Sequence, residues 1–152
     1  MYIGADHKGF YLKEALKNYL QHTGYEVVDV GNNVFDQNDD YPDFAFKVAK
    51  EVFVDPQSRK GIVICGSGAG VSVVVNKVPG IRAVLAISPD HIYQSRKDLD
   101  VNVLALAADF IDLELAKKII GVWLQTPFSG EERHRRRINK IREIEEQSKS
   151  FT

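Results

Sequence analysis

The sequence predicts an α/β fold, a three-layer α/β/α sandwich built around a parallel sheet. Apolar segments of strand length alternate with amphipathic segments of helix length, which is the pattern of repeated β–α units. The run Gly61-Ile62-Val63-Ile64 is apolar throughout, as expected for a central strand covered on both faces. The 152 residues suit one domain, and no linker rich in serine, proline or glycine divides them. We therefore expect a single domain over residues 1–152.

The first half of the chain predicts three strands and two helices. Leu12, Leu16 and Leu20 share one face of the first helix, and Gly24 is placed to end it. The polar, turn-rich segment 32–42 is the longest expected loop. The expected strands are about 2–5, 26–30 and 61–64, and the expected helices are about 10–22 and 43–54.

The second half continues the alternation and completes five β–α units, which predict the three-layer sandwich. A helix starts at the glycine-rich segment 65–70 and ends near Pro79-Gly80. After it we expect strands at about 82–87 and 102–107, helices at about 89–98 and 112–124, and a charged final helix at about 130–148. Ligands of such sheets bind beyond the carboxyl ends of the strands. Three strand ends carry polar residues, at Asp6-His7, Cys65-Gly66-Ser67 and Ser88-Pro89-Asp90.

Composition and charge exclude several classes of function. The net charge of -1 gives no general attraction to nucleic acid or to an anionic membrane. One cysteine allows no intrachain disulfide and fits a reducing compartment. No apolar run approaches the ~20 residues of a membrane span, and the N-terminus opens directly into Tyr2-Ile3-Gly4 without a basic or apolar leader. We expect a cytoplasmic protein that binds neither nucleic acid nor membrane.

The segment Cys65-Gly66-Ser67-Gly68-Ala69-Gly70 indicates an anion-binding loop. Three glycines in five residues allow successive backbone N–H groups to turn to one side, and the following helix start adds positive dipole. A cysteine there favours its thiolate, which suits removal of a proton beside a carbonyl. A dinucleotide loop would need a glycine at Val71. A tight turn with a buried structural cysteine remains the alternative.

Two further groups of residues suggest phosphosugar binding. Asp6 and His7 either grip sugar hydroxyls or phosphate, or form a helix cap and a solvated loop residue. Arg133 and Arg137 are four residues apart and share a helix face, so two guanidinium groups suit one phosphate. The alternative for the arginines is a solvated basic helix face.

Several phrases in this order resemble the ribose-5-phosphate isomerase B and galactose-6-phosphate isomerase family over about residues 2–142. They are Gly4-Ala5-Asp6-His7-Lys8-Gly9-Phe10, Asp40-Tyr41-Pro42, Ile64-Cys65-Gly66-Ser67-Gly68-Ala69-Gly70, Asn76-Lys77-Val78-Pro79-Gly80-Ile81-Arg82-Ala83, Ser95-Arg96, Asn102-Val103-Leu104-Ala105 and Arg133-His134. The resemblance implies a five-stranded, Rossmann-like parallel sheet. It also implies a homodimer with each active site built across the interface and reached by the C-terminal helix, without metal or cofactor.

The resemblance also implies roles for individual residues. Cys65 would be the base that moves a proton between C1 and C2, and Val71 stands where a second type of family member carries a glutamate. The enediolate oxygen would be held by Ser67 and by the backbone N–H groups of Gly66, Gly68, Ala69 and Gly70. At the other end of the substrate, Asp6 would bind sugar hydroxyls and His7 would lie near the phosphate, which Arg133 and Arg137 would bind.

Two positions depart from the family pattern. Asp98-Leu99 replaces the usual His-Asn, whose histidine opens the furanose ring, and Asp109 replaces an arginine that reaches the phosphate of the partner subunit. Asp98 could act as the acid, but its reference pKa of about 3.9 is low for that role. Arg135 or Arg136 could offset Asp109.

We expect an aldose–ketose isomerase of phosphosugars, with ribose 5-phosphate and ribulose 5-phosphate as substrate and product. The alternatives are an isomerase of another phosphosugar such as a hexose 6-phosphate, one subunit of a heteromeric isomerase, and a phosphosugar-binding protein without catalysis. A homodimer is expected, and pairing of dimers into a tetramer is left open.

Overall fold

The computed structural model describes residues 1–151 and contains one five-stranded sheet. The last residue of the expected single domain, Thr152, lies outside the described residues. The strands are β1 (Tyr2–Ala5), β2 (Val28–Asp29), β3 (Gly61–Cys65), β4 (Ala83–Leu85) and β5 (Val103–Ala107). The helices are α1 (Phe10–His22), α2 (Tyr41–Phe53), α3 (Ala69–Val75), α4 (Pro89–Leu99), α5 (Leu113–Gln125) and α6 (Glu132–Ser148).

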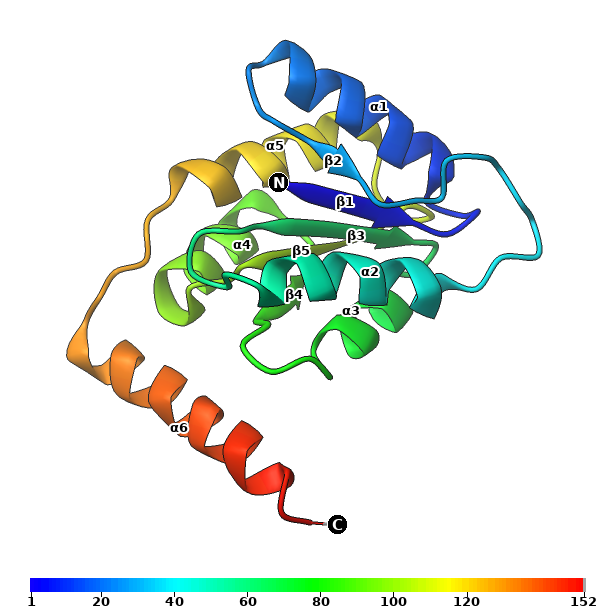
Figure 1. Ribbon diagram of the computed structural model, residues 1–152. Coiled ribbons are helices and arrows are strands. Elements are labelled where there is room, and N and C mark those ends of the chain that lie inside the picture. The colour runs from blue at the N-terminus through cyan, green and yellow to red at the C-terminus, as the bar shows by residue number, and fades with distance from the viewer. Residues whose placement is uncertain (152) are drawn as a thin grey trace.

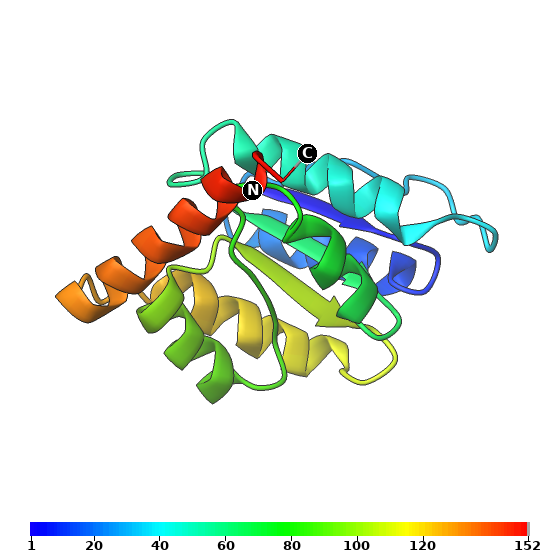
Figure 2. The same ribbon diagram turned by 90° about the horizontal axis from the view of Figure 1, so that it is seen from below.

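All the strand pairs are parallel, and the strand order is β2-β1-β3-β5-β4. Helices α2 and α3 cover one face, and α1, α4 and α5 cover the other, as Figures 1 and 2 show. The predicted three-layer α/β/α sandwich with a parallel sheet is confirmed. All five strands therefore end at one edge, toward the right in Figure 1, and we call this the carboxyl edge.

The alternation of side chains along β3 divides the core into two parts. Ile62 and Ile64 pack toward α1 and α5, whereas Val63 and Cys65 pack toward α2 and α3. This follows from the two-residue period of a strand. Because every residue of β3 is buried, the continuous apolar run in the sequence is explained by two covered faces.

Some element boundaries differ from the sequence prediction. The second strand is shorter than the expected 26–30, because only Val28 and Asp29 pair with β1 at the edge of the sheet. Helix α3 ends at Val75 because the next residue, Asn76, turns the chain: its side chain donates to the carbonyl groups of Ser72 and Ala83.

Helix α6 leaves the sandwich after an extended connection and lies beyond the end of α4 (Figures 1 and 2). Its contacts with the rest of the chain include one with α4 and one with Gly80. His134 is buried beside Asp98 of α4, and the Glu145 carboxylate accepts from the backbone N–H of Gly80 at 3.0 Å. In this chain α6 thus lies away from the carboxyl edge.

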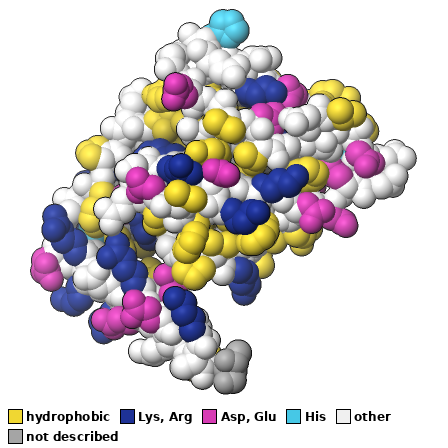
Figure 3. Space-filling view, viewed as in Figure 1, with side chains coloured by type: hydrophobic (Ala, Val, Ile, Leu, Met, Phe, Trp, Pro, Cys, Tyr) yellow, Lys and Arg dark blue, Asp and Glu magenta, His cyan; other side chains and the backbone are white. Residues whose placement is uncertain are grey.

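The outer surface of the α2–α3 layer carries hydrophobic side chains, which gather near the centre of the face in Figure 3. Phe46, Phe53 and Val73 are exposed there. Among the residues described, no helix is both long and apolar enough to cross a membrane.

Candidate functional site

The structure brings together the two strand ends that the sequence singled out. Ala5 of β1 lies opposite Ile64 of β3, so Asp6 and Cys65 follow neighbouring strands at the carboxyl edge. The Asp6 N–H donates to the Ile64 carbonyl at 3.3 Å, which extends the pairing to the site itself.

Cys65 is the last residue of β3 and is buried, with 4% of its surface exposed. It lies in the apolar cluster between the sheet and the α2–α3 layer, together with Val71 of α3. Packing alone accounts for this burial, so the structural-cysteine alternative stays open on this observation. The position nevertheless places the thiol where β3 turns into the glycine loop.

The glycine loop needs its glycines for two physical reasons. A Cβ on Gly66 would lie 2.6 Å from the Asp109 carboxylate. Gly68 has φ of +69°, and a Cβ there would lie 2.4 Å from the Leu85 side chain. Only glycine tolerates the close approach at position 66, and the close approach with positive φ at position 68, without shifting neighbouring atoms.

This loop retains free hydrogen-bond donors. The backbone N–H groups of Gly66, Ser67 and Gly68 donate to no other group within residues 1–151. Ala69 donates weakly to the Ser67 hydroxyl, at 3.3 Å. Successive unpaired N–H groups in a tight turn form a concave site for an anionic oxygen. The following helix α3 has only seven residues, so the loop carries this property rather than the helix dipole.

Asp6 is buried and bonds the local backbone. Its carboxylate accepts from the Gly9 N–H at 3.0 Å within the turn before α1, but the N-cap of α1 is Gly9 itself, so Asp6 is not the helix cap that the alternative expected. Burial raises the pKa of Asp6, against the hydrogen bond from Gly9 and the charge of His7.

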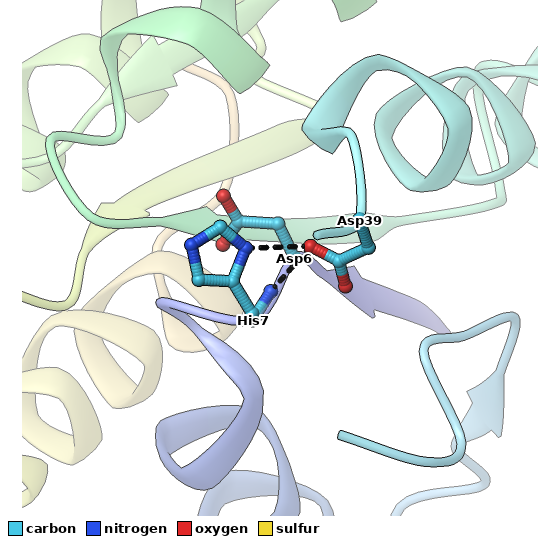
Figure 4. Close-up of side chains that lie close together, drawn as sticks. All are labelled: Asp6, His7 and Asp39. Carbon is cyan, nitrogen blue, oxygen red and sulfur yellow. Dashed lines mark hydrogen bonds and ion pairs between the residues drawn. The ribbon is translucent and has the colours of Figure 1, made fainter. Parts of the chain in front are cut away.

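His7 is held by Asp39, a residue without a predicted role. The His7 ring Nδ1 lies 2.7 Å from the Asp39 carboxylate, and the His7 backbone N–H donates to the same oxygen at 2.9 Å (Figure 4). Asp39 belongs to the polar 32–42 loop, so that loop reaches the site. The adjacent phrase Asp40-Tyr41-Pro42 was the only sequence signal near it.

One atom each of Asp6, His7 and Asp39 lie within 4.8 Å of one another, a spacing that a metal ion could use. In this structure those side chains are already engaged in hydrogen bonds with one another and with Gly9. The cluster is therefore a hydrogen-bonded group in which Asp39 fixes the His7 ring.

Lys8 and Asp109 lie beside the glycine loop, with Lys8 Nζ 3.7 Å from Asp109 Oδ2. Asp109 also donates its backbone N–H to the Gly66 carbonyl at 2.9 Å. The cation that faces Asp109 is thus Lys8, a residue without a predicted role. Arg135 is on α6 and donates to the Gly130 carbonyl at 2.8 Å.

The remaining expected site residues lie elsewhere in the chain. Asp98 is near the end of α4, just before β5 begins, and therefore near the opposite edge of the sheet from Cys65. Its carboxylate accepts from Gln94 at 2.9 Å and lies 3.4 Å from the His134 ring. Arg133 pairs with Glu131 at 2.8 Å, and Arg137 is exposed with no ion pair within residues 1–151. Within one chain these three residues do not join the carboxyl edge.

An apolar pocket of about 320 Å³ adjoins the glycine loop on the side of β4 and β5. Ile87 and Phe110 line it and are 67% and 78% exposed. Ser67 forms the boundary between this pocket and the loop.

Comparison with known proteins gives the family. Residues 1–141 match the Ribose/Galactose Isomerase family. The chain is 40% identical to ribose-5-phosphate isomerase B of Escherichia coli over 144 residues, 95% of each chain. It is also 40% identical to a probable ribose-5-phosphate isomerase B of Mycoplasma genitalium over 148 residues, 97% of each chain.

Solved structures agree. The crystal structure of ribose-5-phosphate isomerase B from Mycoplasma genitalium with bound ribulose-5-phosphate superposes with a TM-score of 0.93 at 41% identity, covering 96% of this chain and 95% of that one. Sequence, sheet order and the polar carboxyl edge thus lead to the same assignment. The chain belongs to the ribose/galactose isomerase family, a family of aldose–ketose isomerases.

Proposed function

We propose that this chain interconverts ribose 5-phosphate and ribulose 5-phosphate, with Cys65 as the base. The Cys65 thiolate removes the C2 proton of the open-chain aldose and leaves a cis-enediolate. The same proton returns to C1, and the hydroxyl proton on O2 passes to O1, which completes the ketose. No redox partner is consumed, because the two carbons exchange oxidation state.

The observation that carries this proposal is that unpaired backbone N–H groups directly follow Cys65 in the chain. The enediolate bears its charge on an oxygen within two bonds of C2, the carbon from which Cys65 removes the proton. Free N–H groups of Gly66, Ser67 and Gly68 begin immediately after the thiol and suit that charge. Ala69 and Gly70 begin α3 directly after these donors, and Asp6, at the neighbouring strand end, would bind the sugar hydroxyls.

Binding of the substrate's phosphate requires a second copy of the chain in this proposal. His7 lies at the carboxyl edge, whereas Arg133, Arg137 and Asp98 do not reach Cys65 of the same chain. We propose a homodimer in which α6 and α4 of one copy bring these residues to the edge of the other. The arginines then bind phosphate, and Asp98 is positioned to open the ring.

Turnover of ribose 5-phosphate by the purified chain tests this function. We expect Cys65→Ala to reduce turnover by about 10²–10⁴-fold, the range for loss of a positioned base, with unchanged circular dichroism and unchanged phosphosugar binding. Cys65→Ser, with a hydroxyl of similar shape, should stay well below wild type. Full activity in Cys65→Ala would exclude Cys65 as the base.

A second candidate function is phosphosugar binding without catalysis. Two observations favour it: the Asp98 carboxylate already contacts Gln94 and His134, and the Asp109 carboxylate lies against Gly66 of the glycine loop. Binding of ribose 5-phosphate without turnover, even when open-chain ribulose 5-phosphate is supplied, would support this function. Turnover of a hexose 6-phosphate instead, or only after addition of a second subunit, would identify a different substrate or a heteromeric enzyme.

A further inference from the structure

Asp39 makes three hydrogen bonds that together fix one imidazole. Its Oδ1 lies 2.7 Å from His7 Nδ1 and accepts from the His7 backbone N–H at 2.9 Å. Its Oδ2 accepts from the Asn32 side chain at 2.7 Å. The Asp39 side chain is 8% exposed, so water competes little for these bonds.

This geometry determines which nitrogen of His7 carries hydrogen. An ionised carboxylate only accepts, so Nδ1 must be protonated to bond Asp39. Nε2 then points away from Asp39, as Figure 4 shows, and bonds no other group within residues 1–151. The His7 side chain is 27% exposed, so part of the imidazole is open to solvent at the carboxyl edge.

The charges around His7 favour its protonated form. The hydrogen bond to Asp39 raises the pKa of His7, and the Asp6 and Asp39 charges act in the same direction, whereas burial and Lys8 oppose them. Burial acts to raise the pKa of Asp39, but the hydrogen bonds from His7 and Asn32 outweigh it and leave this pKa below its ordinary value. These groups come from the end of β1 and from the 32–42 loop.

We propose that Asp39 is the positioning residue of His7: it holds the imidazole through Nδ1 so that Nε2–H faces the phosphosugar, while Asn32 fixes the Asp39 carboxylate. Asp39 itself does not touch the substrate. The proposal rests on the proposed function for the identity of that ligand. It gives the polar loop before α2 a defined task, because the loop brings Asp39 to the strand end that carries His7.

Nitrogen-15 NMR of the imidazole groups tests the hold on His7 without any substrate. The His7 signal is identified by its absence in His7→Gln. Wild type should show a protonated Nδ1 and a titration midpoint above that of an ordinary histidine. In Asp39→Asn the midpoint should fall, because the carboxylate that stabilises the cation is gone. Asp36→Asn is the matched control, since Asp36 lies in the same loop, is exposed, and bonds only its own turn.

Kinetics on ribose 5-phosphate then tests the consequence for binding. The KM of Asp39→Asn should rise about tenfold, the effect of weakening one charge-assisted hydrogen bond, with a smaller change in kcat. Because protonated His7 is lost as the pH rises through its pKa, the rise of KM should begin at a lower pH in Asp39→Asn than in wild type. Asp39→Glu, which restores the carboxylate, should recover part of the loss.

A double variant separates positioning from general damage to the fold. If Asp39 acts only through His7, Asp39→Asn should have no further effect on KM in a His7→Gln background. Additive effects, or an unchanged His7 midpoint in Asp39→Asn, would overturn the proposal. If the NMR result is as expected but no phosphosugar is turned over, the hold on His7 stands and the proposed function fails.

Discussion

At the scale of single residues, the carboxylate of Asp109 is the least expected feature of the site. It lies against Gly66, beside a loop whose free N–H groups suit an anion. A negative charge there opposes binding of an anionic substrate. Lys8, the neighbour of His7, is 3.7 Å away and faces it. The two charges offset each other beside the glycine loop. Both side chains are about half exposed, so their attraction is screened by solvent.

We predict that Lys8→Met weakens phosphosugar binding because it leaves the Asp109 charge unopposed. KM should rise about two- to fivefold at low salt, the range of an exposed ion pair, and less at high salt. Adding Asp109→Asn to Lys8→Met should restore KM.

Lys117→Met serves as the control, since Lys117 pairs with the exposed Glu114 on α5. Equal effects of Lys8→Met and Lys117→Met would contradict a local role for Lys8. An additive rather than compensating double variant would contradict the pairing with Asp109.

At the scale of elements, a partly buried ion cluster joins α1 to the edge strand β2. The Lys13 side chain is fully buried, and its Nζ lies 2.5 Å from Asp29 and 2.6 Å from Glu14. Lys17 bonds the same two carboxylates. Strand β2 has only two residues in the ladder, so this cluster supplements weak pairing. Burial acts to raise the pKa of Asp29, but hydrogen bonds from Lys13, Lys17 and the Gly31 N–H outweigh it and keep this pKa low.

We predict that Asp29→Asn destabilises the fold by about 3 kcal/mol, because it leaves the buried Lys13 charge poorly compensated. For a chain of this size the melting temperature should fall by about 6–12 °C. Calorimetry against Glu114→Gln, an exposed residue whose loss should cost within about 0.5 kcal/mol, measures the difference. Equal melting temperatures would show that the cluster contributes no net stability.

The same cluster predicts a pH dependence. Folding lowers the pKa of Asp29. The contribution of Asp29 to the free energy of unfolding is therefore complete above the unfolded pKa of about 3.9. It is lost as the pH falls through the pKa of the folded state. The stability difference between wild type and Asp29→Asn should therefore be full at neutral pH and narrow below about pH 4. A constant difference down to acid unfolding would contradict this linkage.

At the scale of the whole molecule, the residues expected in the site divide between two places. Asp6, His7, Cys65 and the glycine loop lie at the carboxyl edge, while Asp98 and the α6 arginines lie away from it. The exposed side chains of Ile87 and Phe110 adjoin Ser67 at the same edge. Exposed apolar surface at this edge is what the proposed dimer with shared active sites would cover.

We predict that Phe110→Glu converts the proposed dimer into monomers and lowers turnover, because it puts a charge into the contact beside the glycine loop. Light scattering after size-exclusion chromatography measures the mass, and a phosphosugar assay measures the activity. Val54→Glu is the matched control, since Val54 is exposed at the opposite edge, at the end of α2. An active monomer in wild type would refute the shared site.

Much of the fold was predictable because it depends on local patterns. The period of the apolar residues identifies α1, and the continuous apolar run identifies β3, since each pattern reports which side chains are covered. The boundaries of β2 and α3 were less predictable. They depend on the pairing of Val28 with Tyr2 and on the bonds of Asn76 to Ala83, which join residues separated in sequence.

For the site, the sequence by itself determined the glycine loop, its cysteine and the Asp6-His7 strand end, because each is a short contiguous phrase whose residue types limit its geometry. Only the tertiary structure decided that Asp39 holds His7 and that Lys8 faces Asp109. It also decided that Asp98 meets His134 rather than Cys65. These pairs join residues 32, 101 and 36 positions apart, and a side-chain contact over such distances is set by the packing of strands and loops, which no local pattern records.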